Sequence, residues 1–165
     1  EFFEKLNNME DISTSQPTPT EVMDIWDKAL EKFDQIVYIP ISSGLSGSCQ
    51  TATTLAQDEP YQGRVFVVDN GRVATPMHQS VLDAIELVKE GCTAQQVKER
   101  LEAAKKKKGI FIAIDNLAYL KKGGRITSSA AVMAGLLNIK PILKFDIGIL
   151  SAHKKCRGFA KAKKQ

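Results

Sequence analysis

The sequence predicts an α/β fold: a mostly parallel sheet with helices on both faces, plus part of a second α/β lobe. Short apolar runs typical of strands alternate with longer helical patterns, which is the arrangement of βαβ units. The strand-like runs are continuously apolar, as expected of a parallel sheet covered on both faces. This alternation ends after residue 114, so we place the first lobe at residues 1–114 and the second at 115–165.

The first well-marked element is a helix that begins after Thr18. Thr18 and Glu21 form a capping box, and Pro19 occupies the first helical position, where its missing N–H costs nothing. An apolar stripe at helical spacing follows and predicts a face packed on the core, made of Val22, Ile25, Trp26, Ala29, Leu30 and Phe33.

Two strands and the helix between them come next. Residues 35–41 are rich in β-branched and aromatic side chains and predict a buried strand. A Gly/Ser turn at 42–48 leads into a helix at 49–57. A second apolar strand at 65–68 ends on Asp69.

Two further helices and a strand complete the predicted first lobe. A helix at 77–89 is expected to turn Val81, Leu82, Ile85 and Val88 inward, with Gly91 ending it. Thr93 and Gln96 begin another helix, which extends to about Lys107. Residues 110–114 predict a third strand of the parallel sheet.

The residues of the predicted second lobe no longer alternate between strand and helix patterns. A short helix reaches Lys122, Gly123 and Gly124 turn the chain, and segments 139–145 and 149–151 predict an antiparallel hairpin. The small apolar residues at 130–137 suit either a tunnel wall or an ordinary core helix. The chain's basic end, 154–164, is interpreted as helical.

Composition narrows the functional classes. Apolar residues make up 43% of the 165 residues, and the net charge is +4, concentrated at 105–108 and 154–164. These basic runs are either solvated surface or a contact for an acidic partner or anionic lipid. Aromatic residues fall in predicted strands and apolar faces, so a nucleic-acid surface is not expected.

Three widely spaced cysteines, Cys49, Cys92 and Cys156, follow no metal-binding pattern and indicate reduced thiols in a cytoplasmic protein. We expect neither a secretory signal nor a membrane-spanning segment.

The 42–48 turn is the strongest candidate for chemistry. It joins the carboxyl end of a predicted parallel strand to a helix N-terminus, where open α/β sheets bind ligands. Serine hydroxyls, backbone N–H groups and the helix dipole would attract a carboxylate or phosphate there, and Gly44 and Gly47 allow close approach. The simpler interpretation is a helix start with ordinary serine caps.

Two other segments could contribute to the same site. The cluster 14–17 is either a plain loop or a second hydroxyl clamp. Arg125 could pair with a carboxylate or phosphate entering between the lobes, or the segment 121–127 could be only a helix end with a glycine stop. The Asp69-Asn70-Gly71 turn could orient a ligand, although turn chemistry alone explains it.

An enzymatic interpretation finds little support. A serine nucleophile needs a histidine base, and the two histidines, His78 and His153, do not end predicted strands. No glycine-rich turn has the Gly-Lys-Ser/Thr ending of a P-loop. No catalytic residue, metal site or cofactor is therefore assigned.

Taken together, these segments resemble the DegV family of bacterial fatty-acid-binding proteins. The string Ser-Ser-Gly-Leu-Ser-Gly after Thr-Ser-Gln-Pro is specific, whereas Gly-Gly-Arg-Ile and Lys-Pro are weak alone. The matching segments are 14–17, 42–48, 68–69, 123–126 and 139–143. Relative to the family, the first lobe here lacks its first strand and the second lobe is truncated.

The resemblance implies a carrier, not an enzyme. Thr14 and Ser46 would hold the fatty-acid carboxylate, with Ser43, Gly44 and Gly47 supporting them and Arg125 near the head group. The acyl chain would lie in a tunnel between the lobes. Arg157 resembles a residue linked to docking of a fatty-acid kinase, which would phosphorylate the bound carboxylate.

These expectations leave one alternative: an enzyme or sensor that binds a small carboxylated or phosphorylated metabolite at the same turn. A base or metal near Ser46 would distinguish it. Bound fatty acid is the only expected ligand. No other cofactor is expected, and the protein is expected to be a monomer.

Overall fold

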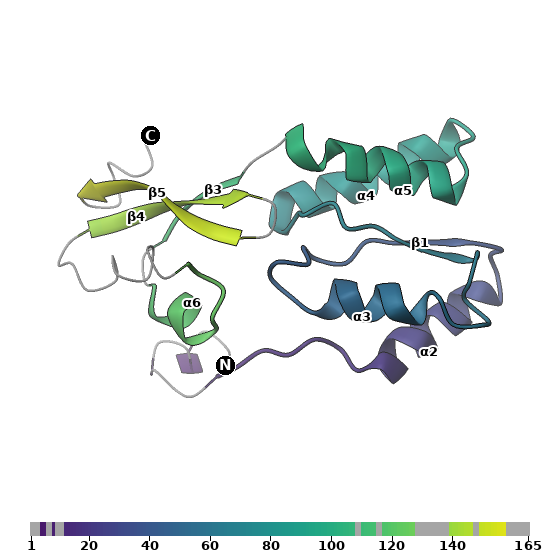
Figure 1. Cartoon of the computed structure of the whole chain (residues 1–165), viewed down its shortest axis with the longest axis horizontal. Helices are drawn as coiled ribbons and strands as arrows, with labels where there is room; N and C mark the ends of the chain where they lie inside the picture. Colours follow the sequence, from purple (N-terminus) through teal and green to yellow (C-terminus); the bar gives the residue numbers. More distant parts are fainter. Residues whose placement is uncertain are drawn as a thin grey trace.

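The structure, a computed structural model, describes residues 4–5, 8, 12–107, 110–114, 117–127, 139–146 and 149–157 (Figure 1). Its elements are α2 (Pro19–Leu30), β1 (Ile36–Tyr38), α3 (Ser48–Leu55), β2 (Val65–Val67), α4 (Ala74–Lys89), α5 (Ala94–Ala103), η1 (Ala104–Lys107), β3 (Ile110–Ala113), α6 (Ala118–Lys122), β4 (Ile139–Asp146) and β5 (Ile149–Arg157). Strands β1 and β2 form a parallel pair, and β3, β4 and β5 form an antiparallel sheet.

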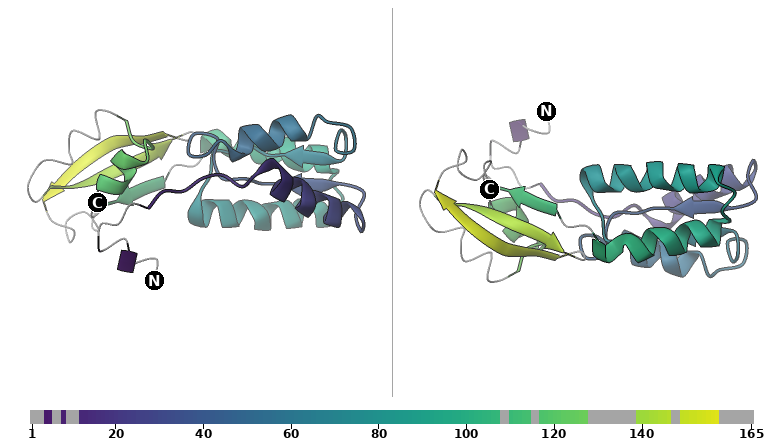
Figure 2. Two further views of the ribbon diagram at one scale, coloured as in Figure 1. Left: turned by 90° about the horizontal axis from the view of Figure 1, so that it is seen from below. Right: turned by 90° about the horizontal axis from the view of Figure 1, so that it is seen from above.

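Helices cover both faces of the parallel pair, which confirms the predicted fold class. Figure 1 shows α4 and α5 on one side of β1, with α2 and α3 on the other, and Figure 2 shows the same layers from above and below. Alternation along β1 supplies both faces, since Ile36 and Tyr38 pack toward α2 and α3 while Val37 and Ile39 pack toward α4 and α5.

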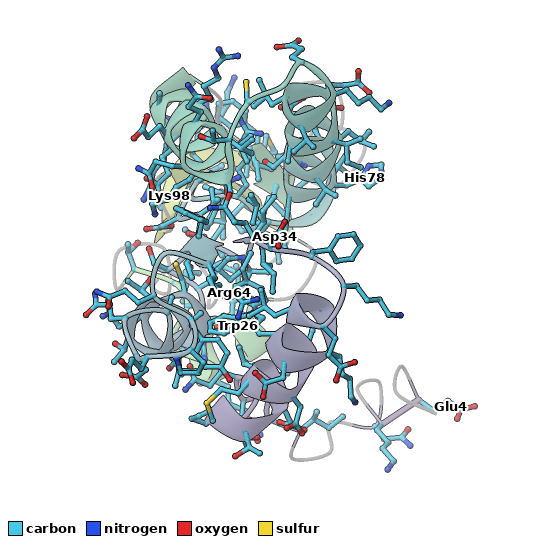
Figure 3. All side chains as sticks on the ribbon, turned by 90° about the vertical axis from the view of Figure 1, so that its right-hand side faces the viewer. Glu4, Trp26, Asp34, Arg64, His78 and Lys98 are labelled. Atoms are coloured by element: carbon cyan, nitrogen blue, oxygen red, sulfur yellow. The ribbon has the colours of Figure 1, made fainter. Side chains whose placement is uncertain are left out.

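Trp26 is the centre of the core beneath α2 and α3. It is fully buried, and its ring meets Tyr38 and Tyr61 edge-on at centroid distances of 5.3 and 5.2 Å. Figure 3 shows it pointing from α2 toward the strands. Tyr61 also donates a hydrogen bond of 2.8 Å to Oδ1 of Asp27, so this core ties the loop after α3 to α2.

Both predicted capping boxes are present. The Thr18 N–H donates to Glu21 Oε2 at 2.7 Å, and the Glu21 N–H donates to Thr18 Oγ1 at 3.3 Å. Thr93 and Gln96 make the same reciprocal pair at the start of α5. Gly91, with a φ of 85°, ends the turn after α4 as expected.

The inward orientation predicted for α4 is wrong. Val81, Leu82, Ile85 and Val88 are each between 41% and 56% exposed, and the buried residues of this helix are Ser80 and Ala84. Three of these side chains, Val81, Ile85 and Val88, line one wall of an open groove of about 430 Å³ between α4 and β1, to which Val37 and Ile39 contribute. Ile25 and Phe33, which were also predicted to pack on the core, are 62% and 64% exposed.

Strand β3 does not extend the parallel sheet, which corrects a second expectation. Ile110 pairs with Phe145 and Ala113 with Ile142, both antiparallel, so β3 belongs to the β4–β5 sheet. The antiparallel sheet thus begins at Ile110, before the lobe boundary predicted at residue 114. The division of the chain into lobes stays a prediction.

The predicted hairpin is confirmed, but its second strand is longer than expected. Strand β5 extends to Arg157, so residues 154–157 form strand, although they belong to the basic end, 154–164, that was interpreted as helical. Pairing with β4 overrides that local tendency. The buried side of β4 carries Leu143 and Phe145, which pack with Leu150 of β5.

Candidate functional site

The turn at 42–48 joins β1 to α3 and is organised around Ser42. This residue is 1% exposed, and its N–H donates to the carbonyl of Arg72 at 2.9 Å. Its carbonyl accepts the N–H groups of Leu45 at 2.9 Å and Ser46 at 3.2 Å, and its hydroxyl oxygen accepts from the Gly44 N–H at 3.3 Å. The backbone therefore fixes the shape of the turn before any ligand arrives.

Helix α3 begins without a side-chain cap. Its N-cap residue is Gly47, and the first intrahelical bond is donated by Thr51 to the Gly47 carbonyl at 2.9 Å. The N–H of Ser48 is accepted by Oγ of Ser46, and the other N–H groups of the first turn, together with the positive end of the helix dipole, favour an anion. This is the arrangement expected from the sequence.

Ser46 can donate to such an anion. Its Oγ accepts the N–H of Ser48 at 3.2 Å, and no hydrogen bond within the described residues uses the hydroxyl hydrogen. Ser43 differs, because its hydroxyl donates to Oδ2 of Asp69 at 2.8 Å. Ser46 therefore has a hydroxyl hydrogen available for a ligand, whereas the hydroxyl hydrogen of Ser43 is used by Asp69.

Gln16 brings the segment containing Thr14 to the turn. The Gln16 amide donates to Oγ1 of Thr51 at 3.0 Å, and its Oε1 would lie 2.8 Å from a Cβ placed on Gly47. Glycine at this position permits the close approach. Thr14 itself is exposed, two residues before this contact, and its role stays a prediction.

Arg125 reaches the same turn from the other side. Its Nε donates to the carbonyl of Leu45 at 3.3 Å, and its Nη1 donates to the carbonyl of Gly123. The side chain of Leu45 packs against the apolar cluster of the second sheet, which includes Leu117 and Leu143. The Ser/Gly turn thus lies where the parallel and antiparallel parts of the structure meet.

A network around Asp69 was not foreseen in detail. Asp69 follows β2, and its Oδ2 accepts from both Ser43 and Lys105, the latter at 2.9 Å. Burial is the largest influence and raises the pKa of this carboxyl, but the hydrogen bonds from Lys105 and Ser43 outweigh it, so the pKa is lowered overall. The only sequence signal was an aspartate at the end of a strand.

A second buried polar group was missed altogether. Arg72 is 4% exposed, and its Nη1 donates to Oγ of Ser80 at 2.6 Å and lies 3.7 Å from Oδ2 of Asp83. Asn70 donates to the same serine at 2.8 Å. Nothing in the sequence separates this buried arginine from an exposed one in a turn.

The histidines do not form a catalytic group with the turn. Figure 3 shows His78 on the outer side of α4, and His153 lies on β5, where its ring is 4.7 Å from that of Phe111. Within the described ranges, no cluster of three or more His, Cys, Asp or Glu residues could hold a metal ion. In the same part of the chain, no helix is long and apolar enough to cross a membrane.

Two earlier assignments fall outside what the structure describes. The backbone of Arg157 pairs with Ile139 at the end of β5, but its side chain is not among the described groups. The apolar segment 130–137 is likewise outside the described residues. Both stay predictions.

Comparison with known proteins places these features in a family. The profile of the DegV family, described as "Uncharacterised protein, DegV family COG1307", matches residues 1–165. A DegV domain-containing protein of Deinococcus radiodurans is 38% identical over 150 residues, which covers 91% of this chain and 53% of the relative.

Solved structures agree with this assignment. A fatty-acid-binding DegV family protein from Thermus thermophilus is 34% identical with a TM-score of 0.85, over 98% of this chain and 57% of that one. DegV from Bacillus subtilis, described as a fatty-acid-binding protein, is 29% identical with a TM-score of 0.80, over 99% and 58%. The chain therefore spans little more than half the length of these relatives, and it belongs to the DegV family.

Proposed function

We propose that this protein binds one long-chain fatty acid, with the carboxylate at the Ser/Gly turn and the acyl chain directed between the two lobes. Ser46 and Thr14 donate to the carboxylate, and Arg125 lies near the head group. Gly44 and Gly47 keep the backbone close, and Ser43 supports the turn.

The observation that carries this proposal is the position of Leu45 and Ser46. Ser46 offers a hydroxyl hydrogen at the uncapped start of α3, while the preceding Leu45 packs against the apolar cluster of the second sheet. A polar donor and an apolar surface thus lie side by side, as an amphiphilic ligand requires. Relatives described as fatty-acid-binding proteins support the same ligand class.

Energetics favour a fatty acid over a small anion at such a site. Burial of an acyl chain contributes about 0.8 kcal/mol per methylene before ordering costs. The polar groups then need only to orient one end of the ligand, which suits a site built from a hydroxyl, N–H groups and an exposed arginine. A small phosphate or carboxylate would gain none of this apolar contribution.

The protein then acts as a carrier and not as an enzyme. It presents the bound carboxylate to a fatty-acid kinase, which supplies ATP and forms the acyl phosphate, and Arg157 contributes to docking of that kinase. Replacing Arg157 with Ala should slow acyl-phosphate formation by a purified fatty-acid kinase without changing fatty-acid affinity. Equal rates for both forms would refute the docking role.

The direct test is denaturing extraction and mass spectrometry of the polypeptide at its cellular length, purified from a bacterial expression host. We expect stoichiometric long-chain fatty acid in the wild type. A combined Thr14→Ala and Ser46→Ala variant should lose it, because hydrogen bonds to a charged group contribute about 1.5–3 kcal/mol each.

The matched control is Thr54→Ala, which removes an exposed hydroxyl from α3 that bonds only to the carbonyl of Gln50 in the described structure. This variant should retain the lipid. Because Ser46 also accepts the Ser48 N–H, denaturant unfolding must show that the double variant is folded. Wild-type protein without lipid, or a folded double variant that retains it, would refute the proposal.

A further inference from the structure

The carboxylate of Asp69 is hydrogen-bonded to the proposed ligand turn. It follows β2 and is reached by Ser43 from the turn and by Lys105 from η1, at 2.8 and 2.9 Å, both at Oδ2. Its backbone N–H donates to Oε1 of Glu102 on α5 at 3.0 Å. Three separate elements therefore converge on one aspartate.

The charges around Asp69 are balanced in pairs. Lys105 neutralises Asp69, and Lys98 neutralises Glu102 at 2.8 Å while also donating to the carbonyl of Val67. From α3, Cys49 faces the same region, and the pKa of its thiol is raised by burial first and by the charge of Asp69 second. A thiol with a raised pKa stays neutral, so Lys105 is the cation that cancels the charge on Asp69.

Removal of that cation would place a negative charge behind an anion site. Ser43 and Ser46 belong to one turn, whose form is fixed by the carbonyl of Ser42. With Lys105 present, Asp69 acts as an acceptor that orients the Ser43 hydroxyl. Without Lys105, an ionised Asp69, bonded to Ser43, would repel a ligand carboxylate held at Ser46, three residues after Ser43 in the same turn.

Lys105 is well placed for this role and is not a solvated surface lysine. Its side chain is 23% exposed and lies across Gly71, where an added Cβ would come within 3.0 Å of Cε. Gly71 has a φ of 65°, so both backbone conformation and space favour glycine beneath the lysine. The turn after β2 is thus shaped to receive this side chain.

We propose that Lys105 and Asp69 form a positioning pair that keeps the Ser43 hydroxyl directed away from the ligand and makes the turn electrostatically receptive to carboxylates. This inference rests on the proposed fatty-acid site and assigns it a specificity-determining residue outside the turn. Lys105 acts through Asp69 and touches no ligand.

The test compares an acidic and a neutral ligand of equal chain length, a fatty acid and its methyl ester. Isothermal titration with Lys105→Met should show about three- to tenfold weaker binding of the acid at neutral pH, and unchanged binding of the ester. A purely structural role would weaken both ligands alike.

The pH dependence supplies a second readout. Loss of Lys105 removes a cause that lowers the pKa of Asp69, so the aspartate should become protonated at a higher pH than in the wild type. Acid binding by Lys105→Met should therefore recover as the pH falls, until fatty-acid protonation intervenes. A double variant, Lys105→Met with Asp69→Asn, should bind the acid as tightly as the wild type throughout.

Lys89→Met is the matched control, because it removes the same charge from an exposed pair with Glu86 on α4. It should leave acid binding unchanged. If Lys105→Met binds the acid like the wild type, or weakens acid and ester equally, this inference is wrong and the proposed function stands. If the wild type binds no fatty acid, both are wrong.

Discussion

A methyl group on Gly47 should release the Gln16 side chain, which ties the segment carrying Thr14 to α3, while leaving the fold intact. The Cβ of an alanine there would lie 2.8 Å from Oε1 of Gln16, which has to move. The Gln16 amide would then lose its two hydrogen bonds with Thr51, of 3.0 and 3.3 Å. Gly47 itself has a φ of −65°, which alanine adopts without strain.

The two effects of this substitution on the free energy of unfolding nearly cancel. An exposed hydrogen-bonded contact contributes about 0.5–1.5 kcal/mol net. Replacing glycine by alanine at a compatible position returns about 0.4–1 kcal/mol, because the unfolded chain loses freedom. The free energy of unfolding should therefore change by less than about 1 kcal/mol. Fatty-acid affinity should fall about tenfold or more, since one hydrogen bond to a charged carboxylate contributes about 1.5–3 kcal/mol.

Urea unfolding and fatty-acid titration of the same preparation measure the two effects. The matched control is Gly63→Ala, at the opposite end of the parallel pair, where φ is 73° and no atom lies within 4 Å of the added Cβ. Strain alone should cost about 1–2 kcal/mol there, with no change in affinity. Gly47→Ala binding like the wild type, or destabilised more than Gly63→Ala, would refute the reasoning.

Two further predictions concern the core beneath α2. Trp26→Ala should lower the free energy of unfolding by about 3–5 kcal/mol in urea, as expected for a fully buried aromatic residue; a loss below about 1 kcal/mol would contradict its central position. Burial, followed by the hydrogen bond to Asp27, raises the pKa of Tyr61 from 10.0 to about 12. Because the folded-state value is the higher one, this contribution is complete below pH 10 and is lost as the pH rises to about 12. Tyr61→Phe should abolish that alkaline loss in unfolding measured as a function of pH, and an unchanged pH profile would contradict it.

Local signals predicted the elements well because they act over a few residues. The boxes at Thr18 and Thr93, and the apolar runs of β1 and β2, need no partner to be interpreted. The errors concern pairings and faces set by distant residues. β3 resembles a buried parallel strand, yet it pairs with β4, and the basic residues of β5 become strand only through the same partner.

Some contacts within the candidate site were predicted, whereas the role of its residues in ligand binding stays a prediction. A strand end and a helix start define the Ser/Gly turn locally, whereas its contact with Arg125, 80 residues away, was expected only from the family resemblance. Lys105 was grouped with a basic run that suited solvated surface. Only the tertiary fold shows that it pairs with Asp69, which is 36 residues away in sequence.

The β4–β5 pair and the β1–β2 pair also differ in the sequence separation between their paired strands. β4 and β5 are neighbours in sequence, whereas β1 and β2 are joined only through the whole of α3. Closing the shorter loop loses less chain entropy, so we expect the hairpin to form early and the parallel pair later. The contact between Arg125 and Leu45 needs both, so the ligand turn should be completed among the last steps of folding. A fatty acid present during refolding would then affect only the last step, because it would stabilise molecules in which the parallel and antiparallel parts are already in contact.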